Sequence, residues 1–240
     1  MGGSSGPQRR RDCGSGTVGD VPVALVTGAA RPNSIAAGIV SRLIADGWDV
    51  ATSDLHDVDY VYDLSSATGP DELLAAVTDE RGPIGALILS HAHDVESGIL
   101  DTTAASFDAH VAVNARASLL LIAACARQVP EGGAVVVLTS GHTTGNLPYG
   151  ASKGALDRIV ISAARELGPK RISANVVNPC PIATGWMDDE LRTALTPAHP
   201  LGGLGTPADI AAIVSFLISN EGRWVSGQLI NADGGFSARF

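Results

Sequence analysis

The sequence predicts an α/β fold: a doubly wound parallel sheet of seven strands in a single domain. Short runs of Val, Ile, Leu and Ala alternate with longer segments whose apolar residues recur every three or four positions. Runs that are apolar throughout are typical of strands covered by helices on both faces, as in parallel sheets. The chain has 240 residues, 45% of them hydrophobic, which is enough for one domain with a substantial core.

The first strand–helix–strand unit opens the folded part of the chain. Residues 21–27 are apolar and β-branched and predict a buried strand. A helix is expected over residues 35–46, with Ser34 as its N-cap and Gly47 just after its end. Residues 50–54 form the second strand. A strand, a turn of small residues, a helix and a second strand in this order are typical of a nucleotide-binding unit.

The rest of the chain continues the alternation. The connection after the second strand is too short for a helix, so one crossover helix is missing there. Each later strand is followed by a helix, which favours right-handed crossovers and a ligand site at the carboxyl ends of the strands. The expected strands are residues 58–64, 84–90, 134–139, 172–178 and 228–231, and the expected helices are residues 71–81, 103–129, 149–167 and 207–219.

Composition narrows the class of protein. The net charge is −9 and the pI is about 5.0, which argues against nucleic acid as a partner. Residues 1–20 are rich in Gly, Ser and Arg, lack the apolar core of a signal peptide, and are expected to be a disordered tail. We expect no membrane-spanning segment. Three widely spaced cysteines indicate no disulfide framework and favour the cytoplasm.

Residues of the first unit are candidates for holding a dinucleotide. Gly28 follows the first strand, and the backbone N–H groups at the start of the next helix could bind a pyrophosphate. Asp54, at the end of the second strand, could accept hydrogen bonds from the adenosine ribose. The glycine pattern is incomplete, because no second glycine occurs until Gly38. Small residues there, from Ser34 to Ala36, still allow backbone to approach phosphate.

Tyr149 and Lys153 are the candidate catalytic pair. Their spacing of four residues places both side chains on one helix face, one turn apart. A nearby ammonium stabilises phenolate and is expected to lower the tyrosine pKa, which makes a general acid/base for a carbonyl or an alcohol. Ser140 could hydrogen-bond the same substrate oxygen.

Together, these motifs resemble those of the short-chain dehydrogenase/reductase family, from residue 21 to about residue 236. The fold is then Rossmann-like, and the activity that the resemblance implies is hydride transfer between a nicotinamide cofactor and a ketone or secondary alcohol. The matching pieces are Thr27-Gly28, Asp54, Asp63-Leu64, Asn114, Ser140, Tyr149 with Lys153, the segment 178–184, the segment 207–210 and Asp233-Gly234-Gly235.

The resemblance also implies roles. Tyr149 donates the proton, Lys153 lowers its pKa and binds the nicotinamide ribose, Ser140 orients the substrate oxygen, and Asn114 kinks its helix and holds a water in a proton relay. No metal is implied; His91 and His93 are interpreted as pocket or loop residues. Cofactor contacts are implied for Gly28, Arg31, Ser34, Ile35, Asp54, Asp63, Leu64, Ser90, His91, Tyr149, Lys153, Pro179, Ile182 and Thr184.

Departures from the family pattern leave alternatives open. Ser34-Ile35-Ala36 resembles the loop of the enoyl-reductase branch, although the Tyr–Lys spacing favours carbonyl chemistry. Ser90-His91-Ala92-His93 replaces the usual Asn-Asn-Ala-Gly and puts in doubt a hydrogen bond that steadies the sheet and the adenosine side. Cys180 replaces a usual Gly, and the loop before Tyr149 is short. An enoyl reductase or a catalytically silent dinucleotide-binding module are therefore the alternatives.

Charged residues near the end of the second strand bear on the choice between NAD(H) and NADP(H). Asp54 would repel a 2′-phosphate, which favours NAD(H), whereas Arg31 and His56 could neutralise one and would allow NADP(H). The other partner is a small carbonyl or alcohol substrate. Helices 103–129 and 149–167 are apolar around much of their circumference, so a homo-oligomer is expected, namely a tetramer joined through a four-helix interface.

Overall fold

The computed structural model describes residues 21–129, 131–142, 144–184 and 189–238, and the predicted tail over residues 1–20 lies outside them. Its centre is one parallel sheet of seven strands in the order β3-β2-β1-β4-β5-β6-β7, which confirms the predicted fold class. The strands are β1 (Val23–Thr27), β2 (Asp49–Asp54), β3 (Tyr60–Val61), β4 (Ile84–Leu89), β5 (Gly133–Leu138), β6 (Ile172–Asn178) and β7 (Leu229–Asn231).

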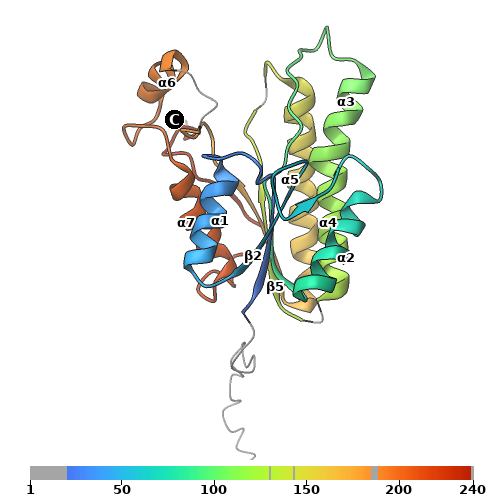
Figure 1. Ribbon diagram of the computed structural model, residues 1–240. Coiled ribbons are helices and arrows are strands. Elements are labelled where there is room, and N and C mark those ends of the chain that lie inside the picture. Colours follow the sequence, from blue (N-terminus) through green and yellow to red (C-terminus); the bar gives the residue numbers. More distant parts are fainter. Residues whose placement is uncertain (1–20, 130, 143, 185–188, 239–240) are drawn as a thin grey trace, which may run out of the picture.

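Helices cover both faces of the sheet (Figure 1). The sheet separates two hydrophobic clusters, one around Leu73, Leu121 and Leu156 and the other around Ile39 and Val214. The strand order in the sheet reverses at β1, which pairs with both β2 and β4. A crevice is therefore expected at the carboxyl ends of β1 and β4. One face carries α1 (Ile35–Ala45) and α7 (Pro207–Ile218), and the other carries α2 (Gly69–Arg81), α4 (Ser118–Gln128) and α5 (Leu147–Leu167).

Helix ends follow their capping residues. The Ser34 hydroxyl accepts a hydrogen bond from Ala37 N at 3.1 Å, which confirms Ser34 as the N-cap of α1. At the other end Gly47 has a φ of +88°, the left-handed conformation that stops a helix. Helix α7 begins with a capping box between Thr206 and Asp209. Both helices therefore start at positions fixed by side-chain hydrogen bonds.

Three elements differ from the expectation. Strand β3 has two residues rather than seven, so Asp63 and Leu64 lie beyond it. The helix expected over 103–129 is divided into α3 (Ala104–His110), a π-helical segment η1 (Val111–Ala117) and α4. Helix α6 (Asp189–Leu195) was not expected at all. Two 3₁₀ turns, η2 (Gly168–Lys170) and η3 (Thr196–Ala198), follow α5 and α6.

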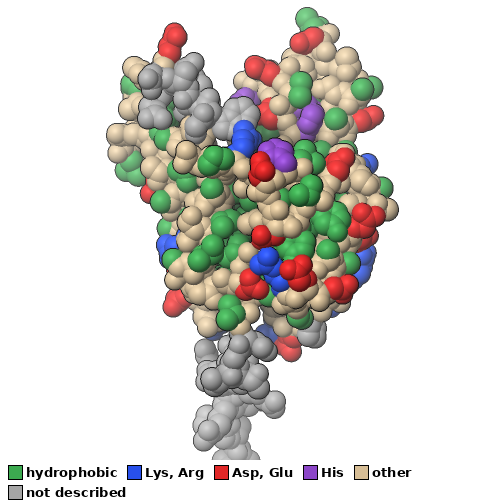
Figure 2. Space-filling model, viewed as in Figure 1, with side chains coloured by type: hydrophobic (Ala, Val, Ile, Leu, Met, Phe, Trp, Pro, Cys, Tyr) green, Lys and Arg blue, Asp and Glu red, His purple; other side chains and the backbone are tan. Residues whose placement is uncertain are grey.

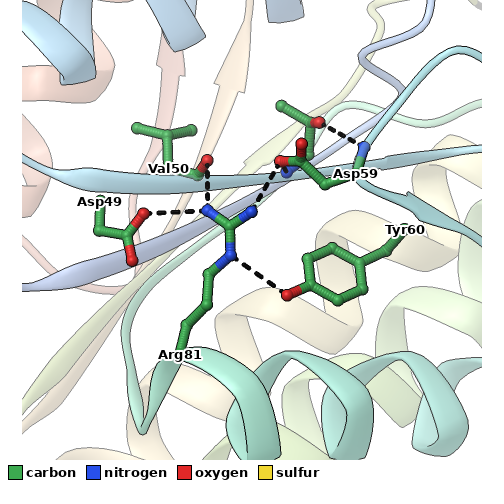
Figure 3. A network of polar contacts seen from close by, with 6 residues as sticks. Asp49, Val50, Asp59, Tyr60 and Arg81 are labelled. Atoms are coloured by element: carbon green, nitrogen blue, oxygen red, sulfur yellow. Dashed lines mark hydrogen bonds and ion pairs between the residues drawn. The ribbon is translucent and has the colours of Figure 1, made fainter.

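Arg81 joins α2 to the sheet edge formed by β2 and the short strand β3 (Figure 3). From the end of α2 its Nη1 donates to the Asp49 carboxylate at 2.9 Å and to the carbonyl of Val50 at 3.1 Å. Its Nη2 lies 3.2 Å from the Asp59 carboxylate, and its Nε donates to the Tyr60 hydroxyl at 3.1 Å. These contacts hold the β2–β3 connection in place although it contains no crossover helix.

One segment corrects the expectation about membrane spans. Residues Ala104–Gln128 form a helix long and apolar enough to cross a bilayer, and half of its most apolar window is buried inside the protein. Its residues Ala117, Leu121 and Cys125 belong to the hydrophobic core. The apolar character of this helix is therefore accounted for by packing against the sheet.

Candidate active site

The predicted site residues gather at the carboxyl edge of the sheet. Gly28 follows β1, Asp54 ends β2, Ser90 follows β4 and Ser140 follows β5 by one residue. Because all these strands are parallel, their ends share one edge. Helix α5 starts just beyond Ser140 and brings Tyr149 to the same end of the sheet.

Lys153 is buried beside the end of β5. Its side chain is 3% exposed, and Nζ donates to the carbonyl oxygen of Leu138 at 2.9 Å. The same nitrogen lies 5.7 Å from the centre of the Tyr149 ring. Burial lowers the pKa of Lys153 to about 8, while the negative charges of Asp157 and Asp94 oppose that shift. The ammonium is thus held one turn from the phenol, as the spacing predicted.

The pKa of Tyr149 corrects one expectation. Burial, and then the charge of Asp94, raise it to about 12, although a hydrogen bond with Ser140 lowers it. Lys153 was expected to lower this pKa below its ordinary value, and it does not. Desolvation penalises the phenolate more than the polar neighbours favour it. Tyr149 is therefore a protonated phenol at neutral pH in this structure.

Asn114 lies within the π-helical segment η1 and is fully buried. Its Oδ1 accepts from His93 N at 2.7 Å, and its Nδ2 donates to His93 O at 2.9 Å. Nδ2 also donates to the Ser152 hydroxyl at 2.8 Å, next to Lys153 on α5. Single-turn π segments commonly mark functional sites. Asn114 thus links the loop after β4 to α5, a connection that sequence reasoning did not find.

His91 replaces the hydrogen bond that the departure after β4 had put in doubt. Its Nδ1 lies 2.7 Å from the Thr27 hydroxyl oxygen, and its Nε2 lies 3.2 Å from the carbonyl oxygen of Val113. A carbonyl can only accept, so Nε2 carries the hydrogen and Nδ1 accepts from Thr27. Burial, then the charge of Lys153, lowers the pKa of His91 to about 4. The neutral imidazole joins β1, the end of β4 and η1, and a contact with cofactor stays a prediction.

The turn after β1 packs closely against the backbone that follows β4. Gly28 has a φ of +74°, and a Cβ there would lie 2.7 Å from His91 N and 2.8 Å from the carbonyl carbon of Ser90. Only glycine lets the two backbones approach so closely. A cavity of about 570 Å³ lies next to this turn, lined among others by Ser34, Thr184 and Thr206. Two of the predicted cofactor contacts, Ser34 and Thr184, therefore share one hollow.

Both carboxylate oxygens of Asp54 accept hydrogen bonds from backbone N–H groups. Its Oδ2 accepts from Ala30 N at 2.9 Å and its Oδ1 from Leu55 N at 2.8 Å. Arg31 is exposed in the turn between β1 and α1. The Asp54 carboxylate thus holds the turn that carries Arg31, in addition to any role towards a ribose.

The other residues predicted to contact the cofactor follow strands of the sheet or begin α1, and their local contacts differ. Asp63 accepts from Ser65 N at 2.8 Å, and Leu64 is buried after β3. Cys180 has a φ of +56°, which explains why glycine is usual at this position. Ile182 is buried and bridges to Gly205, Ile35 packs at the start of α1, and Pro179 is buried after β6.

Two charged neighbours of the catalytic pair were missed as site residues. Asp94 affects the pKa of both Tyr149 and Lys153, and it accepts a hydrogen bond from Asn146. Asp157 stands four positions after Lys153, a spacing that could have identified it from the sequence. Among the described residues no group of three or more His, Cys, Asp or Glu side chains is arranged to hold a metal.

Comparisons with known proteins agree with the motifs. A family model described as "Enoyl-(Acyl carrier protein) reductase" matches residues 28–237. The uncharacterized oxidoreductase YjdA of Bacillus subtilis is 33% identical over 241 residues, covering 89% of this chain and 96% of that protein.

Two solved structures have the same fold. A blue fluorescent protein from a metagenomic library, in complex with NADPH, has a TM-score of 0.83 and 29% identity, covering 90% of this chain and 98% of its own. The angucycline C-6 ketoreductase LanV with bound NADP has a TM-score of 0.80 and 27% identity, covering 90% and 95%. With its parallel sheet, its Tyr149–Lys153 pair and these matches, the chain belongs to the short-chain dehydrogenase/reductase family and is an oxidoreductase of that family.

Proposed function

We propose that this protein interconverts a ketone and a secondary alcohol by hydride transfer with a nicotinamide dinucleotide. The observation that carries the proposal is the catalytic pair: Tyr149 on the first turn of α5, with the Lys153 ammonium 5.7 Å from its ring. Ser140 interacts with the same phenol and Asn114 supports the helix through Ser152. A phenol, a hydroxyl and an ammonium at one point suit the oxygen of a carbonyl.

In the reductive direction, Tyr149 gives its proton to the carbonyl oxygen as that oxygen gains negative charge. Its pKa of about 12 keeps the phenol protonated beforehand. Ser140 donates a hydrogen bond to the same oxygen and so orients the substrate, and the Lys153 charge stabilises the phenolate left after transfer. When bound, the nicotinamide supplies or accepts the hydride.

The residues of the first turn fit such a cofactor. The start of α1 offers backbone N–H groups to a pyrophosphate. We propose NADP(H), although Asp54 alone favoured NAD(H). Both carboxylate oxygens of Asp54 already accept backbone hydrogen bonds, and Arg31 is exposed in the turn that one of these bonds holds. The two similar structures were solved with NADPH or NADP.

Enoyl reduction is the second candidate. The description of the matching family model and the Ser34-Ile35-Ala36 turn favour it. The spacing of Tyr149 and Lys153 favours carbonyl reduction. The position at which hydrogen enters the product separates the two reactions.

The test is a turnover assay with NADPH and with NADH, following loss of absorbance at 340 nm. The substrates are ketones, aldehydes, quinones and enoyl thioesters, and each product is isolated. We expect secondary alcohols from ketones. Saturated thioesters without carbonyl reduction would establish the second candidate, and cofactor binding without turnover on any substrate would favour a silent binding module.

We also propose that the protein is a cytoplasmic homotetramer. Leu119 on α4 and Ile161 on α5 are 47% and 36% exposed, so the outer face of these helices has apolar surface for a four-helix contact. Light scattering at micromolar concentration is expected to give four times the 24.4-kDa chain mass. A mass of one chain would contradict the proposal.

A further inference from the structure

The ammonium of Lys153 is buried, and burial disfavours its charged form. The residue is 3% exposed, and one hydrogen bond, to Leu138 O, satisfies one of its three N–H donors. A buried cation that lacks a partner of opposite charge loses its proton as its pKa falls. The role proposed for Lys153 depends on its positive charge, so a nearby anion is required to maintain it.

Asp157 stands where such an anion is needed. It follows Lys153 by four residues on α5, so the two side chains lie on one face of the helix, one turn apart. Asp157 is half-buried, and its Oδ1 is shielded from solvent without a hydrogen-bond partner of good geometry. The nearby Thr139, at the end of β5, also has a shielded hydroxyl oxygen. The carboxylate therefore faces the protein interior at the strand end where Lys153 is bound.

The two charges act on each other. Burial raises the pKa of Asp157, whereas Thr139 and then the Lys153 ammonium lower it. In return, Asp157 opposes the effect of burial on Lys153 more strongly than Asp94 does.

We propose that Asp157 is a positioning residue that keeps the buried Lys153 ammonium charged and directed towards Tyr149. The catalytic consequence rests on the proposed function, whereas the pairing of the two side chains can be tested without any substrate. Other titratable groups around the pair are Asp94 and His91 in the loop after β4, Tyr149 one turn before, and Arg158, which lowers the pKa of Asp157.

The chain offers a direct measurement, because Lys153 and Lys170 are its two lysines. Protein grown with lysine carrying ¹³C at the ε position gives two NMR signals, and Lys170→Arg assigns them. We expect the Lys153 signal to titrate near pH 8. In Asp157→Asn its midpoint should fall by about one pH unit or more, because an opposite charge has been removed. Lys170, whose Nζ donates to Ala126 O, should not change and reports that the fold is intact.

Three variants sharpen the result. Asp157→Glu keeps the charge and is expected to restore most of the Lys153 midpoint. Asp157→Ser removes the charge with a smaller side chain and serves if the Asn variant does not fold. Glu166→Gln is the matched control, since it removes an exposed carboxylate from the same helix further towards its C-terminus. An unchanged Lys153 midpoint in the Asn or Ser variant would overturn the proposal.

Activity gives the second readout. If the pairing supports catalysis, Asp157→Asn should lose roughly tenfold in turnover above pH 7 and recover towards pH 6, where Lys153 is protonated again. A loss of the same size at every pH would indicate a merely structural role. If no substrate is turned over by the unmodified protein, the proposed function fails, but the NMR titration still decides the pairing.

Discussion

The hydroxyl oxygen of Thr27 and the Nδ1 atom of His91 lie 2.7 Å apart, between the end of β1 and the residue pair that follows β4. Ser90 N also donates to the same hydroxyl at 3.3 Å. The opposite ring nitrogen of His91 reaches the carbonyl of Val113 in η1. One imidazole thus links the ends of the two central strands and connects them to the segment that carries Asn114.

His91 should make stability fall in mild acid. Its pKa is about 4 in the folded protein and about 6.5 in an unfolded chain. As pH falls through this window the unfolded chain binds a proton that the folded protein does not, so folding loses free energy. Between pH 7 and pH 5 the loss is about 2 kcal/mol. Denaturant melts at the two pH values measure it.

His91→Asn provides the comparison for that measurement. Asparagine can still accept from Thr27 but does not titrate. We expect the variant to show a smaller difference between pH 7 and pH 5, whatever its stability at pH 7. An equal difference in both proteins would assign the acid sensitivity to other titratable groups, such as His93, whose pKa is also lowered by burial.

Gly28→Ala should damage both stability and cofactor binding. The added Cβ would meet the backbone of His91 at 2.7 Å, and the φ of +74° is costly for any residue with a Cβ. Gly47→Ala is the matched control, because Gly47 has a φ of +88° with open space around its Cβ position. We expect about 1 kcal/mol of destabilisation for Gly47→Ala and at least twice that for Gly28→Ala. Equal effects would mean that the close approach does not matter.

Arg31→Ala tests the cofactor. Loss of one charge-assisted hydrogen bond to a 2′-phosphate should raise KM for NADPH roughly 10- to 100-fold. KM for NADH should change little. Arg42→Ala is the control, because Arg42 pairs with Asp46 at the far end of α1, the helix that follows Arg31. If Arg31→Ala affects both cofactors equally, or neither, then Arg31 does not select NADP(H).

The sequence indicated the sheet and the catalytic helix because their signals are local. Strand β6 and the N-cap of α1 follow directly from an apolar run and from Ser34. Strand β3 was predicted too long, because residues 58–64 are rich in Val and Tyr but only two of them pair with β2. The π-helical segment around Asn114 depends on hydrogen bonds to His93 and Ser152, which are distant in the chain and have no local signature.

The site was predicted residue by residue, but not its energetics. Spacing placed Tyr149 and Lys153 together, yet burial from elements far apart in sequence determines that the Tyr149 pKa rises. His91 looked like a departure because a histidine was not expected to replace an amide, whereas its ring spans the same gap with two nitrogens. Asp94 approaches the pair through the loop after β4, which no periodicity reveals.

The most direct test of the central claim is turnover by Tyr149→Phe, measured beside cofactor binding. The variant removes one hydroxyl and keeps the ring that packs at the start of α5. We predict a loss of roughly 10²- to 10⁴-fold in kcat for ketone reduction, because the proton donor is gone. The rise in melting temperature on adding NADPH should remain, since binding to the folded state does not need the proton. Turnover by Tyr149→Phe close to that of the unmodified protein would contradict the account.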